Sequence, residues 1–280
     1  MTKLSIIIPA WNEGKVIYQN LHEIEKTLYA VFKRSKIDYE LIIVNDGSSD
    51  NTYKEIQKAA RENHKIKLVS YTKNGGKGFA LKYGFQFCTG DLVTFLDADL
   101  DLHPRQIAHF IGYMKKYGVD IIIGSKRHPQ SDISYPFSRN FLSTAYHFIT
   151  RFFFRLKVTD TQAGLKLFKY DVLADILPRV LCKKYAFDLE LLVSAKRHYY
   201  SIAEAPVTVA WQRDKNRLSL KDTWHIALDT AAICYRLRIK KYYDDGQGAK
   251  TTPVRHVSVD YDDTFIKKLS GSEIPSTVRE

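Results

Sequence analysis

The sequence predicts an α/β fold with a mostly parallel β-sheet flanked by helices. Three observations point to it: five short apolar runs lie in the first 125 residues, segments with helical apolar spacing separate them, and polar clusters follow four of the runs. Strands that alternate with helices at this spacing are typical of a parallel sheet covered on both faces. With 280 residues, of which 45% are hydrophobic, the chain is long enough to bury such a core.

The apolar runs predict five strands, at residues 4–9, 40–45, 66–71, 91–96 and 120–124. The segments between them predict helices at residues 14–32, 50–62, 77–87 and 104–117. Pro9 marks the end of the first strand, because proline cannot donate to a β ladder. Ser48 or Asp50 is suited to cap the second helix, and Gly75 and Gly76 are suited to the turn before the third helix.

Each of the first four strands is followed by a polar cluster. In chain order the clusters are Trp11-Asn12-Glu13, Asp46-Gly47-Ser48-Ser49-Asp50, Asn74-Gly75-Gly76-Lys77-Gly78 and Asp97-Ala98-Asp99. The carboxyl ends of parallel strands share one edge, which is where such sheets bind ligands. Lys77 also begins a predicted helix, where amide groups and the helix dipole favour an anion. The clusters therefore predict one binding cleft.

The fourth cluster is the strongest candidate for a metal site. Asp97 and Asp99, with Asp101 close behind, follow the apolar run at residues 92–96. Two or three carboxylates fixed at a strand end suit Mg²⁺ or Mn²⁺, which prefer oxygen ligands. A metal bound there would hold a diphosphate. A solvated turn after the strand is the alternative interpretation of the same residues.

The charge of the chain predicts an anionic partner. The formal net charge is +12 and the pI is about 9.4, which suits a phosphorylated substrate, an anionic membrane surface or a nucleic acid. The sequence has no zinc-finger spacing, RNA-recognition signature or heptad array. We therefore expect no nucleic-acid partner. The charge does not choose between the other two classes, and the sequence leaves the oligomeric state open.

The compartment is predicted from two further features. The three cysteines are far apart in sequence and lack metal-ligand spacing, so we expect reduced thiols in a cytosolic setting. No run of 18 apolar residues is present, and the first residues lack the basic start and cleavage site of a signal peptide. These features predict a cytoplasmic protein without a membrane span of its own.

Two amphipathic segments follow the predicted sheet. Read as a helix, residues 140–157 align one apolar stripe, which consists of Phe141, Ala145, Phe148, Ile149, Phe152 and Leu156. Residues 222–243 align a second stripe, which consists of Trp224, Leu228, Ala231, Tyr235 and Ile239. Each stripe either packs on the core or lies in a membrane interface. The second segment ends among four cations, Arg236, Arg238, Lys240 and Lys241, which suit an anionic surface or the helix dipole.

Seven segments of the chain stand in the order of a known family. They are LSIIIPAWNE, IIVNDGSSDNT, NGGKGFALKYG, LDADLDLHP, IIIGSKR, DTQAGLKLF and YAFDLELL, and they span residues 4–192. The chain resembles the inverting GT-A glycosyltransferases of family 2, and specifically the polyprenyl-phosphate sugar synthases. DTQAGLKLF, FDLELL and IAEAPVTVAW are most similar to dolichyl-phosphate glucose synthases. The resemblance implies a Rossmann-like GT-A fold with amphipathic interfacial helices.

The resemblance implies a set of residues that bind a nucleotide sugar. They are Pro9, Trp11, Glu13, Asp46, Lys77, Asp97, Ala98, Asp99, Arg213 and Lys215. It also implies that Asp97, Asp99 and Asp101 hold Mg²⁺ or Mn²⁺. Asn45 departs from the family, which usually has aspartate there. Arg213 and Lys215 would form a basic loop over the diphosphate, and a solvated charged loop is the alternative.

The resemblance also implies an acceptor site and catalytic residues. Lys126, Arg127, Arg139 and Ser143 would hold the acceptor phosphate, and the family usually has arginine at position 126. The implied catalytic residues are Asp97, Asp99, Asp160, Gln162 and Glu190. Asp160 as a turn residue and Glu190 as the structural partner of an arginine or lysine are the alternatives.

The resulting hypothesis is a glycosyltransferase that moves a hexose with inversion. We expect glucose from UDP-glucose, transferred to dolichyl or another polyprenyl phosphate by a peripheral protein on the cytosolic face of a membrane. The alternatives are GDP-mannose as donor, a soluble glycan as acceptor, and a basic nucleotide or nucleic-acid binding module without catalysis. We expect a catalytic GT-A domain at residues 1–217, including the amphipathic helix at about 138–157, a C-terminal amphipathic basic helix at 218–245 and a weakly ordered tail at 246–280.

Overall fold

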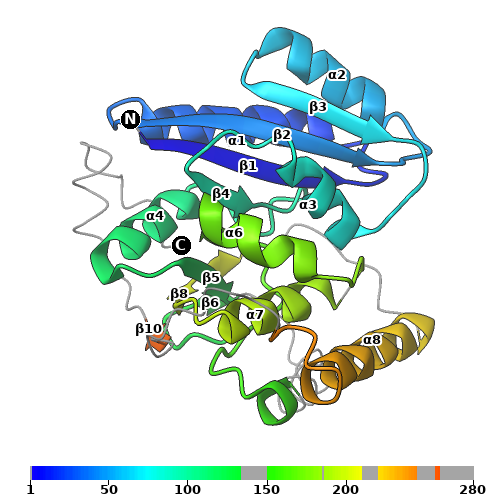
Figure 1. The fold of residues 1–280 in the computed structure, drawn as a ribbon. Coiled ribbons are helices and arrows are strands. Elements are labelled where there is room, and N and C mark those ends of the chain that lie inside the picture. Colours follow the sequence, from blue (N-terminus) through cyan, green and yellow to red (C-terminus); the bar gives the residue numbers. More distant parts are fainter. Residues whose placement is uncertain (1, 134–149, 185, 210–219, 245–255, 259–280) are drawn as a thin grey trace.

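The computed structural model describes residues 2–133, 150–184, 186–209, 220–244 and 256–258 (Figure 1). Its main sheet has eight strands in the order β10-β8-β5-β7-β4-β1-β2-β3. The strands are β1 (Thr2–Ala10), β2 (Ile37–Asp46), β3 (Ile66–Tyr71), β4 (Leu92–Phe95), β5 (Ile121–Ser125), β7 (Lys166–Lys169), β8 (Ile202–Pro206) and β10 (His256–Ser258). Two short strands, β6 (Asp132–Ile133) and β9 (Thr208–Val209), form a separate parallel pair.

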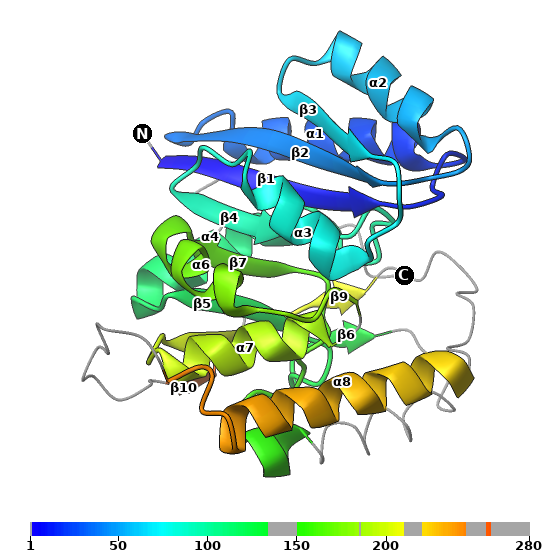
Figure 2. The same ribbon diagram turned by 45° about the vertical axis from the view of Figure 1, so that its right-hand side comes forward.

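The helices cover both faces of the main sheet, and α8 lies outside this layer, beyond α7 (Figures 1 and 2). They are α1 (Ile17–Phe32), α2 (Thr52–Glu62), α3 (Lys77–Phe85), α4 (Gln106–Tyr117), α6 (Tyr170–Ile176), α7 (Phe187–Arg197) and α8 (Leu220–Arg238), with a 3₁₀ turn at Leu177–Arg179. The buried side chains of α1, α2 and α4 form one core with the sheet, and those of α3, α6 and α7 form the other. The five predicted strands and four predicted helices are confirmed.

The strand β7 was not predicted, and it is the only antiparallel strand of the main sheet among the described residues. It lies between β4 and β5 and pairs antiparallel with both. Its sequence Lys-Leu-Phe-Lys is too short and too charged to be recognised as a buried strand. The strand order reverses between β1 and β4, because β2 and β3 lie on one side of β1 and β4 lies on the other. Such a switch point leaves a crevice at the carboxyl ends of its strands.

The first amphipathic segment differs from its predicted stripe. Residues 138–149 lie outside the described part, and a helix ends at Phe154. Phe154 and Leu156 are buried, whereas Phe152 is 78% exposed. Arg155 has a φ of +50°, in the left-handed region, and turns the chain out of the helix. Leu156 therefore does not continue the helical face on which Phe152 lies.

The second amphipathic segment forms α8, which ends at Arg238 rather than at residue 243. Its predicted stripe is exposed, since Trp224, Leu228, Tyr235 and Ile239 all face away from the core. The buried side of the helix contains Thr230 and Ile233 instead. Among the described residues, no helix combines the length and apolarity needed to cross a bilayer.

The C-terminal tail also differs from its prediction at one place. His256–Ser258, within the segment predicted to be weakly ordered, forms β10 and pairs parallel with β8. Its register places His256 opposite Ile202 and Ser258 opposite Glu204. The rest of residues 245–280 lies outside the described part.

We predict that Gly84→Ala destabilises the fold. A Cβ atom on Gly84 would lie 2.6 Å from Cγ2 of Ile7 and 2.8 Å from Cγ2 of Val44, because α3 packs directly on the sheet. Overpacking of this kind costs about 1–3 kcal/mol, and the gain in helix propensity of about 1 kcal/mol offsets only part of it. Urea denaturation measures the change. Gln86→Ala, at an exposed position near the end of α3, is the control and keeps wild-type stability; equal stability of the two variants contradicts the prediction.

Candidate active site

The polar clusters after the first two strands are hydrogen-bonded to each other. The amide of Asn12 donates to Oγ of Ser48 over 3.0 Å, and the amide of Ser49 donates to Oδ1 of Asn12 over 2.9 Å. The amide of Gly14 donates to Oδ2 of Asp50 over 3.0 Å. Asn12 adopts a φ of +55°, which asparagine tolerates better than most residues. The β1–α1 and β2–α2 loops therefore form one wall of the predicted cleft.

Asp46 connects this wall to the glycine-rich loop before α3. Its side chain is buried, and Oδ1 accepts from the amide of Gly75 over 2.6 Å and from the hydroxyl of Tyr71 over 2.8 Å. Oδ2 accepts from the amide of Gly76 over 3.0 Å and from Nδ2 of Asn74 over 3.1 Å. Asp46, which was predicted to contact the nucleoside, thus uses both carboxylate oxygens to hold the loop that leads into Lys77.

Lys77 reaches the fourth cluster directly. Its Nζ donates to Oδ1 of Asp97 over 2.5 Å, and both side chains are about one-third exposed. Burial lowers the pKa of Lys77, but the negative charges of Asp97, Asp188 and Asp99 outweigh this effect and raise it above its ordinary value. The ammonium group is therefore charged at any physiological pH, so it can attract the diphosphate of a nucleotide sugar.

The backbone amides at the start of α3 are already hydrogen-bonded. Gly78 and Phe79 donate to the carbonyl oxygen of Lys183 over 2.9 Å and 3.2 Å. The amide of Gly76 binds Asp46, as described above. A phosphate near this helix start would consequently be held by the side chain of Lys77 rather than by these amides, which differs from the expectation based on the helix dipole.

The loop after β4 fixes the acidic cluster. The carbonyl oxygen of Ala98 accepts from Nδ2 of Asn20 over 2.7 Å, and the amide of Asp101 donates to Oδ1 of Asp99 over 3.1 Å. Leu100, between the two acidic residues, has a φ of +57°. A Cβ atom on Gly164 would lie 1.9 Å from Oδ2 of Asp97, so only glycine fits against this carboxylate.

The three carboxylates do not form a closed metal centre by themselves. Within the described ranges, no group of three His, Cys, Asp or Glu side chains is arranged to hold a metal ion. The donor set nevertheless fits Mg²⁺ or Mn²⁺, because Asp97 and Asp99 provide hard oxygen ligands and are partly exposed at the cleft. Mg²⁺ is commonly bound by one or two carboxylates together with substrate phosphates. The role of Asp101 as a third ligand stays a prediction.

A buried ion pair below the cleft was missed by the sequence reasoning. Nζ of Lys166 lies 2.6 Å from Oδ1 of Asp188, and the two side chains are 1% and 7% exposed. The same Nζ donates to the carbonyl oxygen of Ala163 over 2.5 Å. A lysine between two apolar residues in DTQAGLKLF, together with the acidic residue of YAFDLELL, was the available signal.

The predicted acceptor residues that are described gather around the carboxyl end of β5. Oδ2 of Asp160 accepts from the amide of Lys126 over 3.1 Å, and Oδ1 accepts from the amide of Gln162 over 2.9 Å. The geometry of Asp160 is that of a turn residue, and it brings Lys126 and Gln162 into one loop cluster. Arg127 follows on the exposed side.

Glu204 fixes this predicted acceptor loop, and the sequence reasoning missed it as well. Its Oε1 accepts from the amides of Thr159 and Asp160, over 2.6 Å and 3.1 Å, and its side chain is buried. Burial raises the pKa of Glu204, and the charge of Asp160 adds to the rise, whereas the hydrogen bonds from Thr159 lower it. A lone glutamate within the apolar segment IAEAPV was the signal in the sequence.

Glu190 lies inside the protein. It is 0% exposed, and its oxygens accept from the amides of Leu181 and Cys182, from the guanidinium of Arg236 and from the hydroxyl of Tyr243. This geometry matches the structural alternative, in which Glu190 is the partner of an arginine.

The remaining predicted site residues fall into two groups. Pro9 and Glu13 are partly exposed at the end of β1, and Trp11 is 55% exposed there. Arg139, Ser143, Arg213 and Lys215 lie outside the described residues, so their roles stay predictions.

Comparison with known families agrees with this site. The sequence model of the family described as glycosyl transferase family 2 matches residues 5–177, which include most of β1, all of β2–β5 and β7, the acidic cluster and Lys77. The chain belongs to glycosyl transferase family 2. It is therefore a glycosyltransferase. The matched segment contains all four polar clusters that form the cleft.

Two relatives of this glycosyltransferase are similar over most of the chain. A dolichyl-phosphate beta-glucosyltransferase from Dictyostelium discoideum is 31% identical over 249 residues, covering 85% of this chain and 74% of the relative. One from Trichomonas vaginalis is 29% identical over 249 residues, covering 84% of this chain and 75% of the relative.

Solved structures show the fold that this glycosyltransferase shares with others. Glucosyl-3-phosphoglycerate synthase from Mycobacterium tuberculosis, in complex with Mn²⁺, UDP and glucosyl-3-phosphoglycerate, has a TM-score of 0.61 at 18% identity, covering 88% of this chain and 82% of that one. A mannosyltransferase from Pyrobaculum calidifontis, in complex with GDP-Man and Mn²⁺, has a TM-score of 0.56 at 18% identity, covering 88% and 65%. The predicted GT-A class is confirmed.

We predict that Lys166→Met destabilises this glycosyltransferase by about 3–5 kcal/mol, because the carboxylate of Asp188 is left buried without its partner. The double variant Lys166→Met/Asp188→Leu recovers most of the loss, since an apolar pair needs no compensating charge. Lys169→Met, which breaks a half-exposed pair with Asp120, is the control and costs less than about 1 kcal/mol. Urea denaturation of the four proteins measures the effect. A single variant as stable as the wild type contradicts the prediction.

Proposed function

We propose that this glycosyltransferase transfers glucose, with inversion, from UDP-glucose to dolichyl or another polyprenyl phosphate, as a peripheral protein on the cytosolic face of a membrane. The relatives named dolichyl-phosphate beta-glucosyltransferases support the sugar and the acceptor. A structural neighbour solved with UDP supports the nucleotide. The observation that favours a lipid acceptor over a soluble one is an exposed apolar and basic surface formed by α8 and the helical turn at residues 150–154.

The donor half of the reaction is assigned to the cleft at the switch point. Lys77 provides a permanent positive charge for the diphosphate, and the loops held by Asp46 and Asn12 would enclose the nucleoside next to Trp11 and Glu13. Asp97 and Asp99 would hold Mg²⁺ or Mn²⁺, which supplies positive charge for the leaving diphosphate when it is bound. Arg213 and Lys215 are proposed to close over the diphosphate.

The acceptor half needs positive charge rather than a strong base. A lipid monophosphate has a second pKa of about 6, so at neutral pH it is largely a dianion and already a nucleophile. Lys126 and Arg127 are proposed to hold this phosphate, together with Arg139 and Ser143. Asp160 and Glu204 fix the loop from which Lys126 extends. Positioning and charge stabilisation would then supply most of the rate acceleration.

The membrane assignment rests on a surface that the core leaves uncovered, which we call the α8 surface. Its exposed apolar side chains are Phe152, Phe153, Trp224, Leu228, Tyr235 and Ile239. Trp224 is 65% exposed and Ile239 is 69% exposed, so the helix does not use this side to pack. Large exposed aromatic patches on a protein surface mark sites of interaction with membranes or other proteins.

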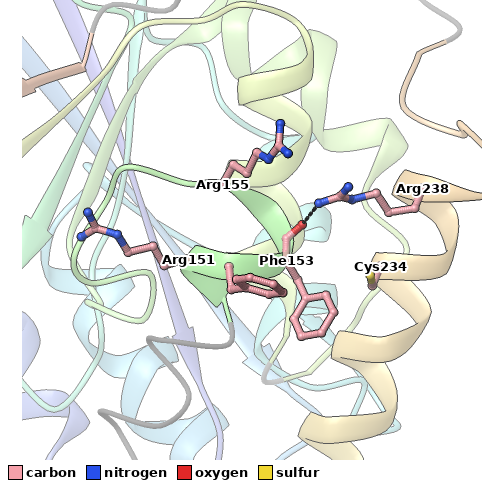
Figure 3. A pocket seen from close by; sticks show the side chains of 6 residues that line it. Arg151, Phe153, Arg155, Cys234 and Arg238 are labelled. Carbon is pink, nitrogen blue, oxygen red and sulfur yellow. Dashed lines mark hydrogen bonds between the residues drawn. The ribbon is translucent and has the colours of Figure 1, made fainter.

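Arginines surround the same surface, which favours an anionic membrane as its partner. A pocket of about 810 Å³ lies between the helical turn and α8, lined by Arg151, Phe152, Phe153, Arg155, Cys234 and Arg238. Figure 3 shows Phe153 directed toward Cys234, while the guanidinium groups of Arg151 and Arg155 point away from Phe153. Arg238 donates to the carbonyl oxygen of Phe153 over 2.8 Å, which joins the two elements. Basic residues near an anionic lipid surface contribute about 1 kcal/mol each.

We predict that the purified protein transfers labelled glucose from UDP-glucose into an organic-extractable lipid when Mn²⁺ or Mg²⁺ and a polyprenyl phosphate are supplied. GDP-mannose, tested in parallel, gives little labelled lipid. Asp99→Ala abolishes transfer while the far-UV circular dichroism spectrum and unfolding midpoint stay unchanged, because the side chain is partly exposed at the cleft. Asp91→Ala, which changes an exposed aspartate at the opposite end of β4, is the matched control and retains transfer. Label that appears only in a soluble glycan rejects the lipid acceptor.

We further predict that the protein floats with liposomes containing anionic phospholipid and floats less at high salt. The double variant Phe152→Ser/Trp224→Ser lowers the floated fraction several-fold, because it removes two exposed aromatic side chains of the α8 surface. Tyr29→Ser is the control: Tyr29 is 61% exposed on α1, which packs on the other face of the sheet. If both variants float like the wild type, the α8 surface is not the membrane contact.

A further inference from the structure

Glu190 makes more contacts than a salt-bridge partner requires. Its Oε2 accepts from two consecutive backbone amides, Leu181 over 2.8 Å and Cys182 over 2.6 Å. The carboxylate is 0% exposed. A buried amide without an acceptor is costly, so these two bonds hold the 181–183 segment to the first turn of α7.

The 181–183 segment in turn holds the start of α3. The carbonyl oxygen of Lys183 accepts from the amides of Gly78 and Phe79, and Nζ of Lys82 donates to the preceding carbonyl of Val180 over 2.7 Å. The two bonds to Lys183 satisfy amides that the first turn of a helix cannot pair internally. Lys77 is the first residue of α3, so its backbone position depends on the segment that Glu190 fixes.

The packing around the first turn of α3 leaves little room for adjustment. A Cβ atom on Gly78 would lie 2.6 Å from the ring of Phe187, and one on Gly76 would lie 2.8 Å from the carbonyl oxygen of Lys183. Gly76 also has a φ of +88°, which side chains rarely allow. Closely packed elements transmit a displacement rather than absorb it. A shift of the 181–183 segment would therefore move Lys77 relative to Asp97.

We propose that Glu190 is a positioning residue for the nucleotide-diphosphate site. It holds the 181–183 segment against α3 and so keeps the ammonium of Lys77 at Asp97, without contacting substrate itself. This inference rests on the donor role proposed for Lys77 above. A positioning role, rather than direct catalysis, then explains the carboxylate of Glu190 in the segment YAFDLELL.

The same carboxylate also connects the donor site to α8. Oε1 of Glu190 accepts from Nη2 of Arg236, over 2.7 Å, and from the hydroxyl of Tyr243. Arg236 belongs to α8, and Tyr243 follows it and is 1% exposed. One oxygen of this buried side chain thus holds α8, and the other holds the 181–183 segment that contacts the start of α3.

The binding of UDP with Mn²⁺, measured by isothermal titration calorimetry, tests the proposal. We expect Glu190→Leu to weaken UDP binding by about ten-fold to a hundred-fold, which corresponds to about 1.4–2.8 kcal/mol, because the ammonium of Lys77 is no longer held in place. Glu190→Gln retains one oxygen acceptor for the two amides and has a smaller effect. In transfer assays the KM for the nucleotide sugar rises, whereas the KM for the polyprenyl phosphate stays unchanged.

Ile233→Ala is the matched structural control. Ile233 is buried on α8 in the same core cluster as Leu189 and Leu191 of α7, so its truncation loosens the packing without touching Glu190. We expect Ile233→Ala to lower the unfolding midpoint and to leave UDP affinity within about two-fold of wild type, because Ile233 makes only apolar contacts and lies apart from the UDP site. Equal losses of UDP affinity in Ile233→Ala and Glu190→Leu would show that Glu190 is only structural and overturn the proposal.

A double-mutant cycle separates positioning through Lys77 from a general effect. If Glu190 acts through Lys77, then Glu190→Gln weakens UDP binding in the wild type but changes it little in a Lys77→Met background. Full additivity of the two losses overturns the proposal. The cycle uses Glu190→Gln, so it does not depend on Glu190→Leu being able to fold.

The outcomes for the two proposals are distinguishable. Failure of the wild type to bind UDP overturns the donor assignment and, with it, the positioning role. Binding of UDP by the wild type and by both Glu190 variants with the same affinity overturns the positioning role alone. The identity of the acceptor affects neither result, because no acceptor is present in the titration.

Discussion

The buried ion pair between Lys166 and Asp188 is the interaction on which the geometry of the cleft depends. Two charges removed from water are costly unless their distance and hydrogen bonds are well fixed. Here the lysine begins β7 and the aspartate lies in the first turn of α7, so the pair joins a central strand of the sheet to the helix beneath the proposed donor site. Gly164, two residues before Lys166, then fits against Asp97. A change at the pair would alter the shape of the acidic cluster.

The first turn of α7 organises three different parts of the protein through neighbouring residues. Phe187 packs against Gly78 of α3, Asp188 pairs with β7, and Glu190 reaches the 181–183 segment and α8. None of the three contacts solvent appreciably, since no side chain among them is more than 7% exposed. The segment YAFDLELL therefore joins α3, β7, the 181–183 segment and α8 inside the protein. Its acidic residues balance positive charge inside the protein, whereas Asp97 and Asp99 face the cleft.

The strands and helices of the first 125 residues were predictable because burial on one or both sides leaves a clear apolar pattern. The four polar clusters were also predictable as one site, because parallel topology alone brings the carboxyl ends of β1–β4 together. The contact that dominates there, Lys77 with Asp97, was not predictable. It depends on how α3 is placed by the Lys183 carbonyl, which belongs to a distant part of the chain.

The amphipathic segments show a different limit of sequence reasoning. The apolar pattern in α8 identifies two faces of the helix but not which of them is buried. The side of α8 that contains Arg236 faces the core, because Arg236 forms an ion pair with the buried Glu190. One of the four cations that suited an anionic surface or the helix dipole, Arg236, is therefore paired inside the protein. In the 150–156 region the left-handed residue Arg155 ends the helical period, so Phe154 is buried and Phe152 is not. The spacing of apolar residues in a sequence does not show the residue at which a helix ends.

The antiparallel strand β7 also bears on how the chain is made. During synthesis β1, β2, β3 and β4 can assemble in turn, because each pairs with an earlier or adjacent strand. In the described part of the chain, β5 pairs with β7 and β8 and with none of these four strands, and both of its partners are translated later. Its run Ile121-Ile122-Ile123, wholly buried in the finished protein, stays an unpaired apolar strand until residue 169 has left the ribosome. An unpaired apolar strand of this kind can form β-sheet hydrogen bonds with another chain. The nascent chain is therefore most exposed to misassociation over the interval in which β5 has been translated and β7 has not.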